Sequence, residues 1–401
     1  MYTMKCIQFA RYTLLIFVGS LFVGAPAVFA AQNDLEVSGW IPYWQDSLGI
    51  RDAKKHLSDL DVVYPFAYTV TTKGELRDQA GLDESKWKNF IKTAHRNNTE
   101  IIPTVMWSDG SSIHTVLSST TTRAAHISQI VDMVKNGKYD GVDIDYEGKK
   151  SETINYFSQF LKELKAKLGS KVLTCTVEAR TPPDSLYKVV PATIAYANDY
   201  TEIGTHCDRV EIMAYDQQRA DLKLNTAKMG EPYMPVADAD WVRKVIVLAL
   251  ESIPKEKIIL GIPTYGRHWT LTVAPDWYKG YERIGALNLP DILDIAKEYK
   301  VTPTRNRSGE MSFTYIPKSS DLKLSKTLAI PRNTTKGNTI AARALAYANK
   351  TGQTVTVNLV WYSDALAVKQ KVDLAKEYSL RGVALFKIDG EEDQKLWKYL
   401  K

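Results

Sequence analysis

Three carboxylates stand at alternate positions in residues 139–147, which read YDGVDIDYE. Side chains on a β-strand alternate between its two faces, so Asp143, Asp145 and Glu147 would share one face. The intervening valine and isoleucine would share the other face, which suits burial under helices. Like charges this close together in a poorly hydrated place raise the pKa of at least one carboxyl group. The pattern predicts an acid–base site in a cleft, and a solvated edge strand is the structural alternative.

This run resembles the DGxDxDxE signature of glycoside hydrolase family 18, the chitinase family. The resemblance implies that Glu147 is the general acid/base. It also implies that Asp145 holds the acetamido group of the substrate. Asp143 would then lie beneath Asp145 and share a proton with it.

A second motif, Met-Ala-Tyr-Asp at residues 213–216, resembles the Met-x-Tyr-Asp of the same family. By this match Tyr215 would hydrogen-bond the acetamido carbonyl, and Asp216 would contact the same sugar. Met213 would line the floor of the pocket. Taken alone, the tetrapeptide is equally explained by a buried tyrosine and a helix-capping aspartate.

Strand-like runs alternate with helical runs along the chain, which favours βα units and a parallel sheet. The expected strands are residues 37–44, 62–70, 101–107, 141–147, 172–178, 209–216, 258–265 and 382–388. Apolar residues at spacings of three and four predict a helix over residues 151–168. This order predicts an α/β fold, a (β/α)8 TIM barrel with catalytic groups at the carboxyl ends of its strands. A doubly wound sheet would need a glycine-rich phosphate turn, which residues 39–42 do not offer.

The βα repeat is interrupted between the seventh and eighth expected strands. The gap contains β-like pieces at residues 312–316 and 354–360 and helical pieces at 289–299 and 339–350. Loops this long usually contain structure of their own. Many chitinases of the family carry a small α+β insertion here, which forms one wall of the substrate cleft. We therefore expect a barrel of residues 31–271 and 357–401, with an α+β insertion domain at 272–356.

Aromatic residues recur at the expected strand ends, where flat sugar faces could stack on them. The candidates for substrate binding are Trp44, Trp107, Tyr265 and Trp269, and a plain core role is the alternative for each. Phe386 stands where the family usually has a tryptophan beneath the sugar that is cleaved. The resemblance implies that Phe386 can still stack with less area, so this departure bears on affinity more than on chemistry.

The first 30 residues have the pattern of a signal peptide. Lys5 and Arg11 form a basic start, an apolar run follows, and Ala30 fits the position before a cleavage site. We expect a mature start near Ala31 and export to the extracellular space or to the periplasm and cell wall. No stable membrane span is expected after cleavage, and an uncleaved anchor is the alternative.

Composition sets further bounds on the protein. With 401 residues and 44% hydrophobic content, the chain can form one large domain with an added module, or two domains. The formal net charge of +6 is spread through the sequence and would suit anionic cell-wall polymers, although ordinary solvated surface explains it equally. The sequence contains no nucleic-acid-binding motif and no Cys–His metal cluster. Cys175 and Cys207 follow the leader, and whether they form a disulfide stays open.

These features predict an exported retaining glycosidase that cleaves β-1,4-linked N-acetylglucosamine glycans such as chitin. The resemblance implies that the substrate's own acetamido oxygen is the nucleophile, so that no metal or organic cofactor is needed. We expect a monomer whose partner is chitin or peptidoglycan. Residues 380–384 resemble the peptidoglycan-lytic branch of the family, so a peptidoglycan-lytic N-acetylglucosaminidase is one alternative. A chitinase-like lectin is another, which the intact Glu147 disfavours.

Overall fold

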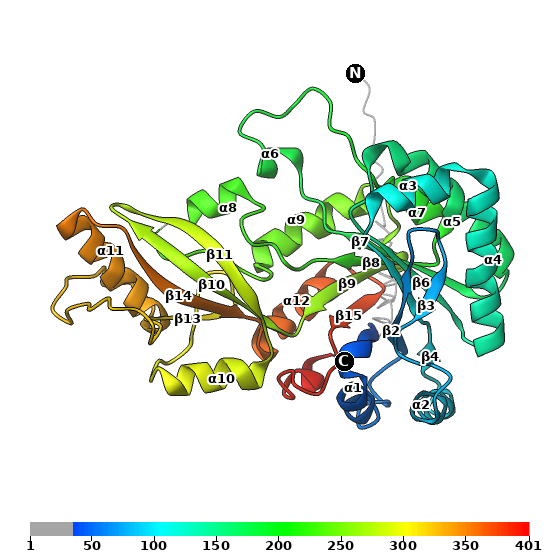
Figure 1. The fold of residues 1–401 in the computed structure, drawn as a ribbon, viewed down its shortest axis with the longest axis horizontal. Coiled ribbons are helices and arrows are strands. Elements are labelled where there is room, and N and C mark those ends of the chain that lie inside the picture. The colour runs from blue at the N-terminus through cyan, green and yellow to red at the C-terminus, as the bar shows by residue number, and fades with distance from the viewer. Residues whose placement is uncertain (1–34, 229, 401) are drawn as a thin grey trace, which may run out of the picture. The chain divides into compact units, whose positions relative to one another are not determined.

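Eight parallel strands close into a barrel in the computed structural model, which describes residues 35–228 and 230–400 (Figure 1). The barrel strands are β1 (Glu36–Pro42), β2 (Val62–Val70), β5 (Thr104–Trp107), β6 (Gly141–Tyr146), β7 (Val172–Glu178), β8 (Arg209–Met213), β9 (Ile258–Pro263) and β15 (Gly382–Phe386). They pair in this order, and β15 pairs with β1 to close the ring. The predicted (β/α)8 barrel is confirmed. The short strand β4 (Glu100–Ile101) pairs in parallel with β2 just before β5, and β3 (Leu76–Asp78) pairs with β2 in the antiparallel direction.

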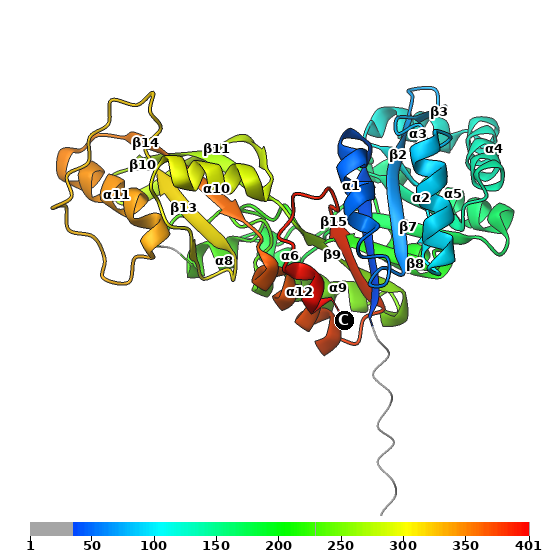
Figure 2. The same ribbon diagram turned by 90° about the horizontal axis from the view of Figure 1, so that it is seen from below.

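Helices follow the strands and surround the barrel (Figures 1 and 2). They are α1 (Asp46–Ala53), α2 (Ser85–Arg96), α3 (Gly110–Ser118), α4 (Thr120–Gly137), α5 (Ile154–Leu168), α6 (Pro183–Leu186), α7 (Tyr200–His206), α8 (Leu222–Ala227), α9 (Ala239–Leu250) and α12 (Ala365–Glu377). The predicted helix at 151–168 is α5, preceded by one 3-10 turn at Ser151–Thr153. Its Phe157, Leu161 and Leu164 are buried, as their spacing predicts.

Three strands differ from their predicted extents, each for a local reason. The expected strand 101–107 is divided into β4 and β5, and Pro103 between them has no backbone N–H for a ladder bond. The expected strand 209–216 ends at Met213, because Asp216 adopts a left-handed conformation with φ of 55°. The expected strand 37–44 ends at Pro42, and Tyr43–Gln45 form a 3-10 turn.

A second, five-stranded sheet lies between β9 and β15 in the chain, where an insertion was predicted. In spatial order it contains β11 (Trp277–Leu287), β10 (Gly266–Ala274), β14 (Val355–Tyr362), β13 (Met311–Tyr315) and β12 (Thr304–Arg305). It is accompanied by α10 (Leu289–Glu298) and α11 (Thr339–Thr351). The sheet extends beyond the expected bounds 272–356 at both ends, because β10 and β14 pair along their whole length from Gly266 opposite Tyr362. A Cβ at Gly266 would come within 2.6 Å of the Cβ of Tyr362, so this pairing requires glycine there.

The apolar side chains of the barrel strands form two separate groups, one packed against the surrounding helices and one inside the ring of strands. Val142 and Ile144 belong to a large apolar core that also contains the buried faces of the surrounding helices. Trp40, Tyr64 and Phe66 belong to a separate, smaller aromatic cluster. Each large apolar side chain that is fully buried contributes roughly 1.5–3 kcal/mol to folding. The inner cluster leaves room for polar side chains at the carboxyl ends of the strands.

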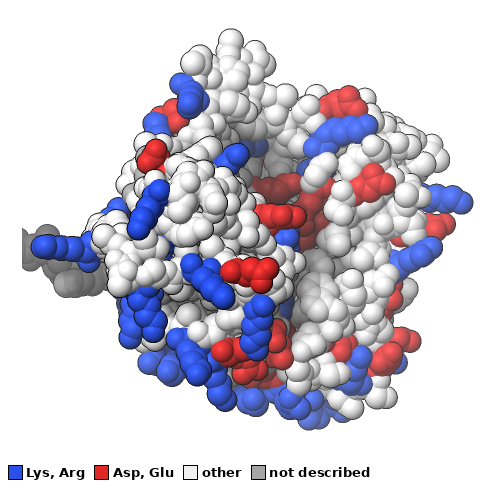
Figure 3. All heavy atoms as spheres, turned by 60° about the vertical axis from the view of Figure 1, so that its left-hand side comes forward, with Lys and Arg blue, Asp and Glu red and all other residues white. Residues whose placement is uncertain are grey.

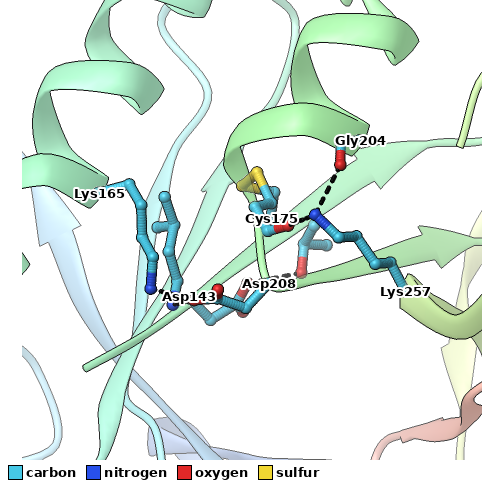
Figure 4. Close-up of a disulfide and its surroundings, with 9 residues drawn as sticks. Asp143, Lys165, Cys175, Gly204, Asp208 and Lys257 are labelled. Atoms are coloured by element: carbon cyan, nitrogen blue, oxygen red, sulfur yellow. Dashed lines mark hydrogen bonds and ion pairs between the residues drawn. A yellow bond between two sulfur atoms is a disulfide. The ribbon is translucent and has the colours of Figure 1, made fainter. Parts of the chain in front are cut away.

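A disulfide joins Cys175 on β7 to Cys207 at the end of α7 (Figure 4). The two Cα atoms lie 6.0 Å apart, and both side chains are fully buried. Lys257 donates to the carbonyl oxygens of Gly204 and Cys207 at 2.8 and 2.9 Å, which satisfies the last turn of α7. The sequence left open whether Cys175 and Cys207 form a disulfide, and the structure contains that bond.

The predicted leader at residues 1–30 and the predicted start near Ala31 lie outside the described residues. Among the helices within 35–400, none has the length and apolar character that a membrane span requires.

Candidate active site

The acidic run forms β6, and its side chains alternate as predicted. Val142 and Ile144 face the helices, whereas Asp143 and Asp145 face the barrel interior. Glu147 follows directly after the strand, and its N–H donates to the carbonyl oxygen of Trp107 at 2.8 Å. The strand therefore presents three carboxylates in a row that runs from the interior toward the carboxyl end of the barrel.

Asp143 is fully buried and is held from three other strands. The Trp40 ring N–H and the Thr104 hydroxyl donate to Oδ2 at 3.2 and 2.7 Å, and the Thr176 hydroxyl donates to Oδ1 at 2.8 Å. Burial raises the pKa of Asp143 to about 6, although these three donors act in the opposite direction. Asp143 is thus a positioned carboxyl group whose charge is easily neutralised.

Asp145 lies one step closer to the carboxyl end and is also buried. Its Oδ1 atom has no hydrogen-bond partner within the described part of the chain. Burial raises the pKa of Asp145 well above its ordinary value, and the negative charges of Glu147 and Asp143 raise it further. A protonated Asp145 would offer a hydrogen-bond donor to a bound ligand. The predicted sharing of a proton between Asp143 and Asp145 stays a prediction.

Glu147 is half-buried at the end of this row. Burial raises the pKa of its carboxyl group above the ordinary value, and the negative charge of Glu178 adds to the rise. The positive charge of Lys149 acts in the opposite direction. A carboxyl group with a raised pKa can hold a proton for transfer and still become a base afterwards.

The Met-Ala-Tyr-Asp motif lies at the end of β8, beside the acidic row. Tyr215 is partly exposed to the cleft, and its pKa is well above the ordinary value because desolvation disfavours the phenolate. It therefore remains a hydrogen-bond donor. Asp216 is held by the guanidinium of Arg267 on β10, whose Nε lies 2.7 Å from Oδ1.

A cleft of about 430 Å³ brings most of the predicted site residues together. Its lining includes Asp145, Glu147, Met213, Tyr215, Asp216 and Phe386, together with Trp40, Phe66, Thr176, Glu178, Ala179, Ala220 and Trp241. Acidic side chains are visible in a hollow of the face that Figure 3 shows. A larger hollow of about 1200 Å³, between α2 and α4, is lined by residues such as Tyr68 and Met133 and contains none of the acidic row.

The predicted aromatic residues divide into two groups. Phe386 lines the cleft and stacks on Tyr215 with ring centroids 5.5 Å apart, and Tyr265 packs behind both rings. Trp44 is half-exposed and touches Phe66 of the cleft edge-on at 5.8 Å. Phe386 and Trp44 are therefore compatible with sugar stacking at the floor and at the rim of the cleft, whereas Tyr265 is 4% exposed and does not line it.

The structure does not bring Trp107 and Trp269 to the cleft. Trp107 is 3% exposed and packs against His126 and Tyr146 in the core beneath the helices. Trp269 is 2% exposed and belongs to the apolar core of the second sheet. Both side chains are core residues, the alternative that was open for each of them.

Known proteins share sequence features with this chain. The family model described as Glycosyl hydrolases family 18 matches residues 39–391, which is most of the chain. The chain belongs to glycosyl hydrolase family 18. It is 24% identical over 296 residues to the glycosylase YvbX of Bacillus subtilis, covering 73% of this chain and 70% of YvbX.

Solved structures of other family members share the fold of this glycosidase. The Bacillus cereus spore cortex-lytic enzyme SleL superimposes with a TM-score of 0.65 at 19% identity, covering 92% of this chain and 74% of SleL. A chitinase from Chromobacterium violaceum gives a TM-score of 0.66 at 20% identity and covers 91% of this chain and 98% of the chitinase. At these identities the likeness supports the fold alone.

Several residues around this family 18 cleft were missed by the sequence analysis, among them Trp40 and Glu178. Trp40 donates to Asp143, and Glu178 lines the cleft beside Glu147. Both carried a signal, because side chains at alternate positions share a face of a strand. Glu178 lies two residues after Thr176 on β7, so it shares the face from which Thr176 donates to Asp143. It is also the last residue of its strand, and catalytic groups of such barrels lie at the carboxyl ends of the strands.

Proposed function

We propose that the protein is an exported retaining glycosidase that hydrolyses β-1,4-linked N-acetylglucosamine glycans, chitin or its oligomers, by substrate-assisted catalysis. The observation that carries the proposal is the pKa of Asp145 and the bonding partners of the other carboxylates around Glu147. Burial and the charges of Glu147 and Asp143 raise the pKa of Asp145 well above its ordinary value, and Asp216 is bound by Arg267. Glu178 accepts from the Gly148 N–H at 3.0 Å.

This arrangement supports a mechanism without a protein nucleophile. Ordinary retaining glycosidases need a free carboxylate to attack the anomeric carbon, and family 18 enzymes use the substrate instead. In the proposed first step Glu147 donates its proton to the glycosidic oxygen, the bond from that oxygen to the anomeric carbon breaks, and the acetamido oxygen forms the new bond. The product of this step is an oxazolinium ion and a shortened glycan.

The residues around Glu147 have matching roles in this proposal. Asp145 and Tyr215 orient the acetamido group and stabilise the positive ion. Glu147, now a carboxylate, accepts a proton from water as the water attacks the anomeric carbon and the bond from that carbon to the acetamido oxygen breaks, so the configuration is retained and the acetamido group is restored. Asp143 shares a proton with Asp145 and allows it to change its charge between the two steps. Phe386 and Trp44 contribute to sugar stacking in and around the cleft, Tyr265 supports the ring of Phe386, and the enzyme acts as a monomer.

The charge of the cleft favours a neutral sugar at the site of cleavage. Its lining contains four carboxylates and no lysine or arginine among the described residues. A muramic acid carboxylate would find no positively charged partner among these lining residues, whereas N-acetylglucosamine needs none. A peptidoglycan-lytic N-acetylglucosaminidase also places N-acetylglucosamine at the cut and is the second candidate, favoured by the 22% identity over 273 residues to the cortical fragment-lytic enzyme of Bacillus subtilis.

Export is part of the proposal. The leader pattern of residues 1–30 supports it, and so does the disulfide between Cys175 and Cys207, because such bonds persist mainly in oxidising compartments.

The experiment that tests this function compares three substrates on one sample of enzyme. N-acetylated chito-oligomers, the same oligomers fully deacetylated, and purified peptidoglycan are incubated in parallel, and the products are identified by mass spectrometry. We expect cleavage of the acetylated oligomers and none of the deacetylated ones, which lack the internal nucleophile. Equal rates on acetylated and deacetylated oligomers would exclude substrate assistance, and release of fragments from peptidoglycan alone would favour the second candidate.

A further inference from the structure

The loop that follows Glu147 is fastened to the end of β7. The Gly148 N–H donates to Oε1 of Glu178 at 3.0 Å, and the Asn198 side-chain amide donates to Oε2 at 2.7 Å. Gly148 itself has a left-handed φ of 61°, which a glycine adopts without strain. Glu178 therefore fixes the backbone immediately next to the residue to which acid–base chemistry is assigned.

A buried lysine completes this attachment. The side chain of Lys149 has no exposed surface, and its Nζ lies 3.8 Å from Oε2 of Glu178. The same Nζ donates to the carbonyl oxygen of Tyr146 and lies 4.6 Å from the centroid of the Phe157 ring. A buried cation is costly unless it is paired, so Lys149 depends on the negative charge of Glu178.

The charged surroundings of Glu147 single out this pair. The ionisable groups that face it are Asp145 on its own strand, Lys149 in the following loop, Glu178 from β7, and Tyr215 and Asp216 after β8. Asp216 also raises the pKa of Glu147, but its effect is smaller than those of Glu178 and Lys149, and it is itself paired with Arg267. Glu178 and Lys149 remain as a negative and a positive charge that act on Glu147 in opposite directions.

We propose that Lys149 and Glu178 form a charge-compensated clamp that positions Glu147 and sets the pH range in which it works. The proposal deepens the proposed function and rests on the assignment of Glu147 as the proton donor. Neither residue of the clamp transfers a proton to the substrate, so both are positioning residues. Lys149 also keeps the pKa of Glu178 below its ordinary value against the effect of burial, so that Glu178 stays charged.

If the clamp acts in this way, substitutions of Glu178 and of Lys149 should move the basic limb of the pH profile in opposite directions. A general acid must be protonated, and the basic limb of the kcat/KM profile reports its pKa in the free enzyme. Glu178→Gln removes a negative charge, which lowers the pKa of Glu147 and moves the basic limb to lower pH. Lys149→Met removes a positive charge and moves the limb to higher pH. We expect shifts on the order of one pH unit, or about tenfold in kcat/KM on the falling limb.

The double variant Glu178→Gln/Lys149→Met distinguishes a clamp from two unrelated structural residues. It contains no unpaired buried charge, so it should fold well and its basic limb should return to within about 0.3 units of the wild-type position. Glu163→Gln is the matched control, because Glu163 pairs with Arg123 between α4 and α5, outside the cleft. Its profile should coincide with that of the wild type.

A second readout does not depend on hydrolysis. The carboxyl carbon of Glu147 is followed by NMR titration in protein labelled with ¹³C at glutamate side chains, and its resonance is assigned by its loss in Glu147→Gln. We expect its titration midpoint to move down in Glu178→Gln, up in Lys149→Met, and back in the double variant. Midpoints that coincide in all variants would overturn the clamp even if hydrolysis is normal. Absence of hydrolysis with shifted midpoints would overturn the proposed function and leave the clamp intact.

Discussion

At the scale of single residues, Phe386 is the aromatic side chain that we propose as the floor of the sugar-binding cleft. Its ring stacks on Tyr215 and meets Trp40 edge-on at 5.8 Å, so it connects the aromatic interior of the barrel with the cleft. The family usually has a larger ring at this place, and Phe386 offers less stacking area. Substrate affinity, rather than proton transfer, should therefore respond to changes at this residue.

We expect Phe386→Ala to raise KM for chito-oligomers several-fold while kcat changes less. Removing a buried aromatic side chain costs about 3–5 kcal/mol in a core, and the cost at an open cleft should be smaller because water can enter. The measurement is KM and Tm on the same preparation. Phe313→Ala is the control, since Phe313 is fully buried in the second sheet and should lower Tm without changing KM. The stacking role would be refuted by a Phe386→Ala enzyme with reduced Tm and an unchanged KM.

Strand parity explains which site residues could be predicted from the sequence. Asp143, Asp145 and Glu147 were predictable because alternation is a local property of a strand. The same rule, applied to β5, would have placed Trp107 on the helix-facing side with Val105, opposite to Thr104, which reaches Asp143. Lys149 was not predictable, because its burial depends on how the loop after β6 packs against β7.

At the scale of elements, the disulfide connects the outer side of β7 to the end of α7. Thr174 and Thr176 lie on either side of Cys175 along β7, so their side chains point to the opposite face of the strand. Thr176 faces Asp143 inside the barrel. The bond therefore lies on the helix side of the strand, outside the cleft. It should matter for stability and little for catalysis.

Removal of this disulfide should lower stability by roughly 2–4 kcal/mol, because the bond closes a loop with a sequence separation of 32 residues. The measurement is Tm of the wild type and of Cys175→Ala/Cys207→Ala, each with and without reductant. We expect reductant to lower Tm of the wild type only. The kcat measured well below Tm should stay within about twofold, and a large loss of kcat in a folded double variant would contradict the separation of the disulfide from the cleft.

The boundaries of the second sheet could not be predicted at the scale of elements. β10 begins three residues after β9 ends, and β14 ends three residues before α12 begins. No glycine- or proline-rich linker marks the points where the chain passes between the barrel and the second sheet. The two strands there pair without interruption, Gly266 to Val273 on β10 with Tyr362 to Val355 on β14. The presence of the insertion was visible in the interrupted βα repeat, whereas its edges depend on pairing between residues far apart in the chain.

For the whole molecule, Asp143 connects β6 to β1, β5 and β7 across the barrel interior through its three donors. Burial raises the pKa of Asp143 in the folded protein to about 6, above the ordinary value of 3.8. The folded state therefore holds this proton more tightly than the unfolded state does. The stability that Asp143 contributes is fully present below the unfolded pKa and is lost as pH rises through about 6.

We therefore expect the wild type to lose about 1 kcal/mol of unfolding free energy, relative to Asp143→Asn, between pH 5 and pH 7. An asparagine cannot titrate, and the other ionisable groups are shared by both proteins. The measurement is urea unfolding of both proteins at the two pH values. If the difference between the two proteins is the same at pH 5 and pH 7, Asp143 does not titrate in this range.

The central claim is that Glu147 moves the proton in both chemical steps. It is tested most directly by the rate at which Glu147→Gln hydrolyses an N-acetylated chito-oligomer, measured together with the Kd of the same oligomer by calorimetry. Glutamine fills the same volume but neither donates nor accepts the required proton, so we predict a loss of at least about 10²–10⁴-fold in kcat with a nearly unchanged Kd. A Glu147→Gln enzyme that binds and hydrolyses the oligomer at the wild-type rate would contradict the account.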